Sequence, residues 1–266
     1  MAKFTSSKAY RAFAESVKNK ARHIFDTECQ TFLEAVVSTG EKRAICLKAG
    51  TQLWRSQLGH DGWYPKEERD ENGGLIDTYE VPEPYESKRM VPLTDRAHEG
   101  RVNPKGIACY YFSTDDKTAV AEARPWLGAY VSVAEFKILR DLRLVDCSGL
   151  STRAWLTNSD SSPEVNEKRV WESINRAFTA PVTRSDDVAD YAPTQVIAEA
   201  LRFNGFDGIK YGSSLGEGRT IAVFDLSAAR LVSRCVYEVD SIEVKSSLAS
   251  SPYYTEDWDG SAPKSE

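Results

Sequence analysis

Four short segments of the sequence carry side chains that could act together on an anionic substrate. In residues 100–106 (GRVNPKG), two glycines and a proline favour a tight turn that holds Arg101 at the start of a strand. A guanidinium is a planar fork that suits phosphate oxygens, and lysine cannot reproduce it. Arg55, beside Trp54, is unusual in a strand-like segment, where apolar and β-branched residues are favoured. It could stack on an aromatic ring at the surface or meet an anion in a cleft.

The other two segments supply a carboxylate and two hydroxyls. Glu122 falls in an expected helix over residues 117–124, among small apolar side chains, and could face solvent or a cleft. Ser213 and Ser214 follow an expected strand, where serines either bind a ligand or form a turn. Serine-hydrolase chemistry is not expected here, because there is no GxSxG motif and no histidine nearby in the sequence.

Composition excludes several other functions. The 266 residues carry a formal charge of −6, which argues against sequence-independent binding of nucleic acids. No apolar run approaches the ~20 residues that span a bilayer. The five cysteines form no CxxC pair and the three histidines lie far apart, so we expect free thiols and no metal site. With no apolar leading segment, we expect a cytoplasmic location.

The elements that must position these residues read as an α+β fold. We expect two N-terminal helices, over residues 6–24 (capped by Ser6 or Ser7) and from Asp26 or Thr27 to 37, with Gly40 just beyond. Further helices are predicted over 163–178 and, capped by Thr194, 194–203. Strands are predicted over 43–47, 52–56, 107–113, 129–133, 142–146, 208–211 and 220–225.

The remaining segments divide the chain. Residues 59–105 have no clear periodicity, and we expect a lid, a binding loop or disorder there. Residues 246–266 are expected to form a disordered acidic tail. The predicted division is an N-terminal helical appendage (1–42), a catalytic domain (43–235) and a C-terminal extension (236–266).

In their order along the chain, these residues resemble the RES domain family, which is named after its Arg, Glu and Ser residues. The resemblance rests on Arg55, residues 100–106, Tyr111, residues 119–122 and residues 191–214, and it spans roughly 48–225. It implies a mixed-sheet fold similar to ADP-ribosyltransferase toxins. It also implies cleavage of NAD at the nicotinamide–ribose bond, by phosphorolysis or hydrolysis, with NAD as substrate, inorganic phosphate as a possible co-substrate and no cofactor.

Carried over by position, the resemblance implies that Arg55, Arg101, Tyr111, Glu122 and Ser213 are catalytic. It places Arg55, Arg101, Tyr111, Ser213 and Ser214 around the substrate. Many family members are toxins neutralised by an Xre-type helix-turn-helix antitoxin, which implies such a partner here; a homo-oligomer is a further possibility. The alternatives are ADP-ribosyl transfer to a protein and a non-catalytic module that binds a nucleotide or a partner.

Overall fold

The structure is a computed structural model, and it describes residues 2–148, 162–180, 190–244 and 246–250. Its strands are β1 (Ala44–Leu47), β2 (Gln52–Leu58), β3 (Gly62–Arg69), β4 (Leu75–Glu83), β5 (Tyr110–Ser113), β6 (Tyr130–Ile138), β7 (Leu142–Asp146), β8 (Gly208–Gly212), β9 (Arg219–Val223) and β10 (Ala229–Glu238). Its α-helices are α1 (Ala9–Asn19), α2 (Thr27–Gly40), α3 (Ser87–Met90), α4 (Asp116–Glu122), α5 (Pro163–Thr179) and α6 (Ala192–Phe203).

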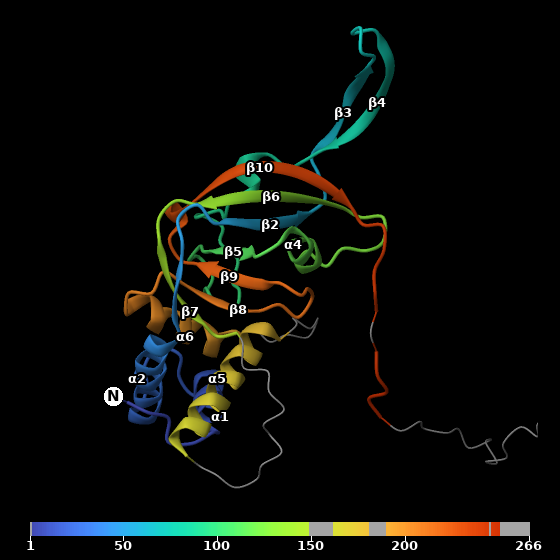
Figure 1. Ribbon diagram of the computed structural model, residues 1–266. Helices are drawn as coiled ribbons and strands as arrows, with labels where there is room; N and C mark the ends of the chain where they lie inside the picture. The colour runs from blue at the N-terminus through green and yellow to red at the C-terminus, as the bar shows by residue number, and fades with distance from the viewer. Residues whose placement is uncertain (1, 149–161, 181–189, 245, 251–266) are drawn as a thin grey trace, which may run out of the picture.

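Within the described residues, one eight-stranded sheet forms the centre of the molecule. Its strand order is β1-β7-β8-β9-β5-β2-β6-β10 (Figure 1). The β7–β8 pair is parallel and the other neighbouring pairs are antiparallel. The predicted α+β class, with a mixed sheet, flanking helices and an N-terminal helical pair, is therefore confirmed.

Helices α1, α2, α5 and α6 gather at the end of the sheet that holds β7 and β8 (Figure 1). Their apolar faces and that end of the sheet share one buried cluster, which includes Phe13, Phe32, Trp171 and Tyr211. The buried Trp171 indole also donates a hydrogen bond to Thr39 Oγ1 at 3.0 Å, so α5 is tied to α2 by a polar contact as well. The N-terminal helices thus belong to the same core as the strand that leads to Ser213.

Strand β5 separates this cluster from a second one. Tyr110 and Phe112 are buried in the second cluster, whereas Tyr111 packs against the first. Since successive side chains of a strand point to opposite faces of the sheet, this alternation turns Tyr111 toward the helices. Helix α4 lies beside β2 and β6, and its Val120 and Ala123 pack against a third small cluster.

The helix ends differ in part from the sequence-based expectations. Asp26 caps α2, at one of the two predicted starting residues, and Asp115 caps α4. Helix α1 is shorter than predicted, and no side chain caps it: Ser6 Oγ accepts a hydrogen bond from the N–H of Lys8, the residue before the helix. Thr194 is also not a cap, because α6 begins at Ala192 and the Thr194 hydroxyl donates to Tyr191 O inside the first turn.

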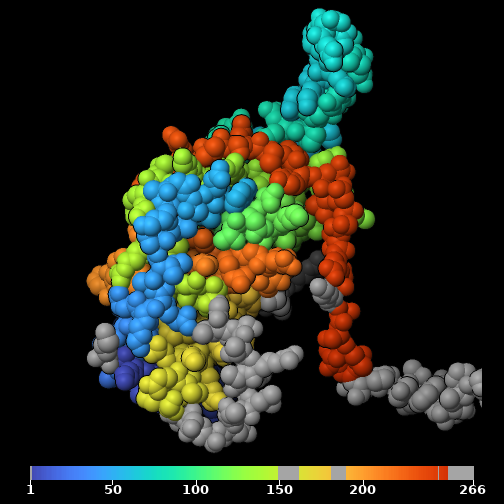
Figure 2. Space-filling model, viewed as in Figure 1, coloured from blue at the N-terminus to red at the C-terminus, as the bar shows by residue number. Residues whose placement is uncertain are grey.

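The expectation of an irregular connection over residues 59–105 was wrong for residues 62–83, where two strands form. Strands β3 and β4 form a two-stranded hairpin that projects from the body of the molecule (Figures 1 and 2). Nearly every residue of the hairpin is exposed, so neither face needs an apolar stripe, and the alternation that reveals a half-buried strand is missing. Asp70 closes its turn, with Oδ1 accepting from the N–H groups of Asn72 and Gly74.

Two strands were underestimated at the other edge of the sheet. Strand β6 runs to Ile138, beyond the predicted end at 133, and it pairs along most of its length with β10, which was not predicted. Strand β10 continues three residues past position 235 and ends at Glu238. Residues 251–266, most of the predicted tail, lie outside the described residues.

Candidate active site

A cavity of about 290 Å³ brings most of the predicted site residues together. It opens between β2, β5, α4, the end of α5 and the end of β8. Its lining includes Arg55, Arg101, Tyr111, Glu122 and Ser214. These residues come from five segments spread over some 160 positions of the sequence, so the fold assembles the group.

Glu122 and Ser213 form the central polar pair. Ser213 Oγ donates to Glu122 Oε1 at 2.6 Å and accepts from the N–H groups of Leu215 and Gly216, at 3.1 and 3.0 Å. Glu122 is exposed at the last residue of α4, where it lines the cavity. Of the two interpretations that the sequence left open, the structure supports a cleft-facing carboxylate at the solvent edge.

The turn after β8 is fastened to the start of α4, which sets the distance between Ser213 and Glu122. Gly218 N donates to Thr118 Oγ1 at 3.0 Å, and Arg219 N donates to Thr114 Oγ1 at 2.9 Å. A Cβ on Gly216 would lie 2.6 Å from Thr118 Oγ1 and 2.9 Å from Thr118 Cα, so only glycine fits against the helix there.

Arg55 is a largely buried cation that lines the cavity. Its Nε is buried and has no hydrogen-bond partner in the described part of the chain. Burial lowers the pKa of the Arg55 guanidinium, but arginine stays charged at neutral pH. A buried, incompletely paired cation is costly, and an anion bound beside it offsets that cost. The structure therefore favours a cleft-facing Arg55.

Arg101 is held against the helical side of the cavity. Its Nη1 donates to Ala177 O in α5 at 2.8 Å, and its guanidinium carbon lies 5.1 Å from the centre of the Tyr191 ring. One edge of the Arg101 guanidinium is thus fixed by the α5 backbone, and the residue lines the cavity.

Tyr111 lines the cavity and also holds the loop that carries Arg101. Its hydroxyl donates to Asn103 Oδ1 at 2.7 Å and accepts from Val102 N at 2.9 Å. Burial raises the pKa of Tyr111 well above its ordinary value, so the hydroxyl remains a proton donor. A Cβ on Gly100 would lie 2.5 Å from the Tyr111 hydroxyl oxygen, which explains the glycine at that position.

Two positioning residues, Asn103 and Gln195, were not singled out from the sequence. The buried Asn103 amide donates to His98 O at 2.9 Å and Ile107 O at 2.7 Å while its Oδ1 accepts from Tyr111. Gln195 Nε2 donates to Gly100 O and Asn103 O, at 2.9 and 3.1 Å, and so ties α6 to the Arg101 loop. The available signal was the presence of both residues inside the segments that carry the resemblance.

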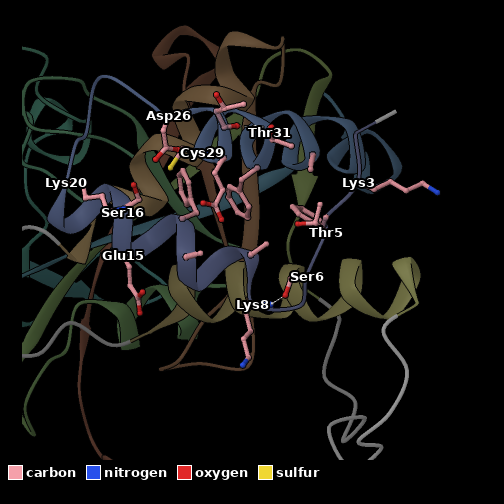
Figure 3. A pocket seen from close by; sticks show the side chains of 18 of the residues that line it. Lys3, Thr5, Ser6, Lys8, Glu15, Ser16, Lys20, Asp26, Cys29 and Thr31 are labelled. Atoms are coloured by element: carbon pink, nitrogen blue, oxygen red, sulfur yellow. Dashed lines mark hydrogen bonds between the residues drawn. The ribbon is translucent and has the colours of Figure 1, made fainter.

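A larger cavity, of about 910 Å³, lies elsewhere, between the N-terminal segment, α1 and α2. Its labelled side chains, among them Lys8, Glu15 and Asp26, come from these three segments (Figure 3). None of the predicted site residues lines it. The smaller cavity, which is lined by the Glu122 carboxylate and by Arg55, Arg101 and Arg124, is therefore the better candidate for chemistry.

Metal-binding groups and membrane-spanning helices are both absent from the described residues. They contain no group of three or more His, Cys, Asp and Glu side chains arranged to hold a metal ion. None of their helices combines the length and the apolar character that crossing a bilayer requires.

Comparison with known proteins gives low-identity relatives. Aspartate–tRNA ligases of Clostridium botulinum strains Alaska E43 and Eklund 17B are 23% and 22% identical over 226 residues, which is 85% of this chain and 36% of theirs. The chain thus spans about a third of the length of these curated relatives. Among solved structures, the M. tuberculosis MbcT–MbcA toxin–antitoxin complex is similar, with 14% identity, a TM-score of 0.38, and coverage of 76% of this chain and 91% of that one.

A family model gives the assignment. The model of the RES domain matches residues 78–245, more than half of the chain. The match includes four of the five predicted catalytic residues, and the fifth, Arg55, lines the same cavity in the structure. The chain belongs to the RES domain family.

Proposed function

We propose that this protein cleaves the nicotinamide–ribose bond of NAD. The observation that carries the proposal is the Glu122 carboxylate, held by Ser213 at 2.6 Å, in a cavity that is also lined by Arg55 and Arg101. A carboxylate and two guanidiniums suit a substrate that combines a cationic ring, a ribose and a pyrophosphate. The family resemblance supports the choice of NAD.

The chemistry follows from the charges. Nicotinamide in NAD is a cationic leaving group, and when its bond to ribose breaks, the electron pair moves to the ring nitrogen and neutralises it. Positive charge then develops on the ribose, as in glycoside cleavage. Glu122 stabilises this charge by its negative charge, and it can accept a hydrogen bond from a ribose hydroxyl.

The other residues orient the substrate. Arg55 and Arg101 hold the pyrophosphate, because charge-assisted hydrogen bonds from guanidinium to phosphate are strong and directional. The attacking oxygen comes from water or from inorganic phosphate, and it forms the new bond to the ribose carbon while its proton passes to solvent. Hydrolysis yields ADP-ribose, and phosphorolysis yields its phosphorylated form.

The direct test is to incubate the purified full chain with NAD, with and without inorganic phosphate, and to measure free nicotinamide. Release that needs phosphate identifies a phosphorylase, and release without it identifies a glycohydrolase. Absence of nicotinamide under both conditions would refute the proposal. Labelled ADP-ribose on a macromolecule would instead identify a transferase, and binding without release would identify a non-catalytic module.

Glu122→Gln is the first prediction. It keeps the shape of the side chain and removes its charge, so we expect kcat to fall by about 10²–10³, with an unchanged melting temperature. Glu199→Gln, at an exposed position of α6, is the matched control and should keep full turnover. Equal kcat in the two variants would exclude the role assigned to Glu122.

An Xre-type antitoxin and a homo-oligomer stay predictions. Co-expression with the product of a neighbouring gene that encodes a helix-turn-helix protein, followed by co-purification, tests the first. Light scattering on the purified chain tests the second.

A further inference from the structure

Two cavities meet at the candidate active site: the active-site cavity itself, and a neighbouring one of about 460 Å³, which is called the second cavity below. Arg55 and Tyr111 line both cavities, so these two side chains form the wall between them. Most of the remaining lining comes from residues 89–99, which follow the hairpin, and from residues 103–109. No role has been given to this cavity so far.

The lining of the second cavity is predominantly cationic. Its charged side chains are Arg55, Arg89, Arg96 and Glu99, which is three guanidiniums against one carboxylate. Arg96 is exposed, and its Nε lies 3.3 Å from a carboxylate oxygen of the neighbouring Asp95. Arg89 lies over the Tyr85 ring, at 3.4 Å from its centre, and so is held in place by stacking.

Arg55 is the independent sign that an anion belongs here. Its Nε is buried and unpartnered in the described residues, and burial lowers the pKa of its guanidinium, while the residue lies at the boundary of both cavities. An anion at that boundary would contact Arg55 and remain within the cationic lining of the second cavity.

The sizes of the two cavities also favour an anion near Arg55. Pockets for drug-sized ligands occupy about 300–1,000 Å³. The active-site cavity, of about 290 Å³, is at the lower limit of this range, and NAD joins two nucleotides. If NAD is the substrate, the reacting nucleotide alone would fill the first cavity, and the pyrophosphate, which joins the two halves, would lie near Arg55.

We propose that the second cavity is a phosphate subsite, in which Arg55, Arg89 and Arg96 bind a phosphoryl group. The proposal rests on the proposed function, and it adds a site and three named ligands to it. The phosphoryl group belongs either to the adenylate half of the dinucleotide or to free inorganic phosphate. The chemistry of recognition is the same for both.

The test is equilibrium binding by titration calorimetry, which does not depend on turnover. Three probes are used: ADP-ribose, inorganic phosphate and nicotinamide mononucleotide, which lacks the adenylate half. Each is titrated into the wild type, Arg96→Gln and Arg89→Gln. Arg230→Gln, at an exposed position of β10, is the control.

We expect Arg96→Gln to weaken the binding of one probe by about five- to tenfold, as loss of a charge-assisted hydrogen bond at an exposed site does. If the adenylate half binds there, the affinity for ADP-ribose falls and the affinity for nicotinamide mononucleotide does not change. If free phosphate binds there, the affinity for inorganic phosphate falls and the affinity for ADP-ribose does not change. Arg89→Gln should follow the same pattern, and Arg230→Gln should match the wild type.

Unchanged affinity for all three probes in both variants, with folding intact by circular dichroism, overturns the phosphate subsite. That result leaves NAD cleavage untouched, because nicotinamide release by the wild type is measured separately. Conversely, a wild type that releases no nicotinamide but binds ADP-ribose through Arg96 would retain the subsite and refute the proposed reaction.

Discussion

The hydrogen-bond partners of Ser213 determine the direction in which its hydroxyl proton points. Its Oγ accepts two backbone N–H groups, from Leu215 and Gly216, which leaves the proton to be donated to Glu122. The hydroxyl therefore orients the carboxylate, and it does so from a turn rather than from a regular element. We regard Ser213 as a positioning residue, since it reaches the cavity through Glu122.

Removing that hydroxyl gives a prediction at the residue scale. Ser213→Ala should slow nicotinamide release by about 10- to 100-fold, which is what a hydrogen bond to a charged group contributes. Ser213→Thr keeps a hydroxyl and should recover most of the rate. A merely structural serine would give equal rates in both variants once their stabilities match, so parallel melting curves complete the measurement.

At the scale of elements, α4 is located by contacts at its first turn. Its cap, Asp115, and Thr118 meet the β8–β9 turn, while Asp116 Oδ2 accepts from the Tyr237 hydroxyl of β10 at 2.7 Å. Glu122 sits at the other end of this short helix. A displacement of the first turn of α4 would therefore also move the Glu122 carboxylate at its other end.

The contact between the β8–β9 turn and α4 is tight enough at Gly216 that one added methyl group would disturb it. Gly216→Ala would press a Cβ against Thr118, and we expect a loss of about 1–3 kcal/mol of unfolding free energy, as for other overpacked sites. Turnover should fall with it, because the backbone that must shift also bonds Ser213. Gly62→Ala, where a Cβ meets no atom within 4 Å, is the control and should change neither quantity.

The Asp116–Tyr237 contact predicts a pH dependence of stability. The hydrogen bond from Tyr237 lowers the pKa of Asp116, and the hydrogen bond to Asp116 raises the pKa of Tyr237 to about 12. The contact therefore stabilises the fold above the unfolded carboxyl value, near 3.9, and is lost as pH falls through the lowered native value. It is also lost as pH rises past about 10 and through about 12.

Tyr237→Phe should accordingly lower the unfolding free energy by about 1 kcal/mol at neutral pH. The difference from the wild type should shrink below about pH 4 and above about pH 10. Thermal melts of both proteins from pH 3 to pH 11 measure it. A constant difference across that range would show that the contact contributes through packing alone.

The sequence predicted these elements unequally, for physical reasons. Asp26 and Asp115 announce helix starts because a cap acts within three residues, and the buried strands β5, β8 and β9 have apolar runs. Hairpin β3–β4 lacks both signals, since it has no buried face. Site residues such as Asn103 were missed because their role lies in contacts between distant segments, which no local pattern records.

At the scale of the whole molecule, the hairpin stands apart from the body. Its exposed large apolar side chains include Leu75 and Ile76, while Trp63 at its base contacts the Tyr130 ring at a centroid distance of 5.5 Å. The hairpin is thus anchored at one end only (Figure 2). Isolated two-stranded hairpins are of marginal stability in water, so its tip should add little to the stability of the body.

Replacing residues 64–81 by a short Gly-Ser turn tests this division. The deletion takes away six carboxylates and two cations, which changes the formal charge from −6 to −2. We expect earlier elution from an anion exchanger, with an unchanged melting temperature and unchanged nicotinamide release. A large fall in melting temperature would show that the hairpin contributes to the core.

The projecting hairpin also separates charge within the molecule. Residues 61–83 hold eight acidic and two basic side chains, and residues 251–266 hold four acidic and one basic. Together they account for a charge of −9 in a chain whose total is −6, so the rest of the sequence, which includes every residue of the site, carries +3. Because the hairpin alone carries −6, the residues outside it sum to zero, so a phosphate-bearing ligand within a Debye length of the cavity, about 8–10 Å, meets a weaker repulsive field than the isoelectric point suggests.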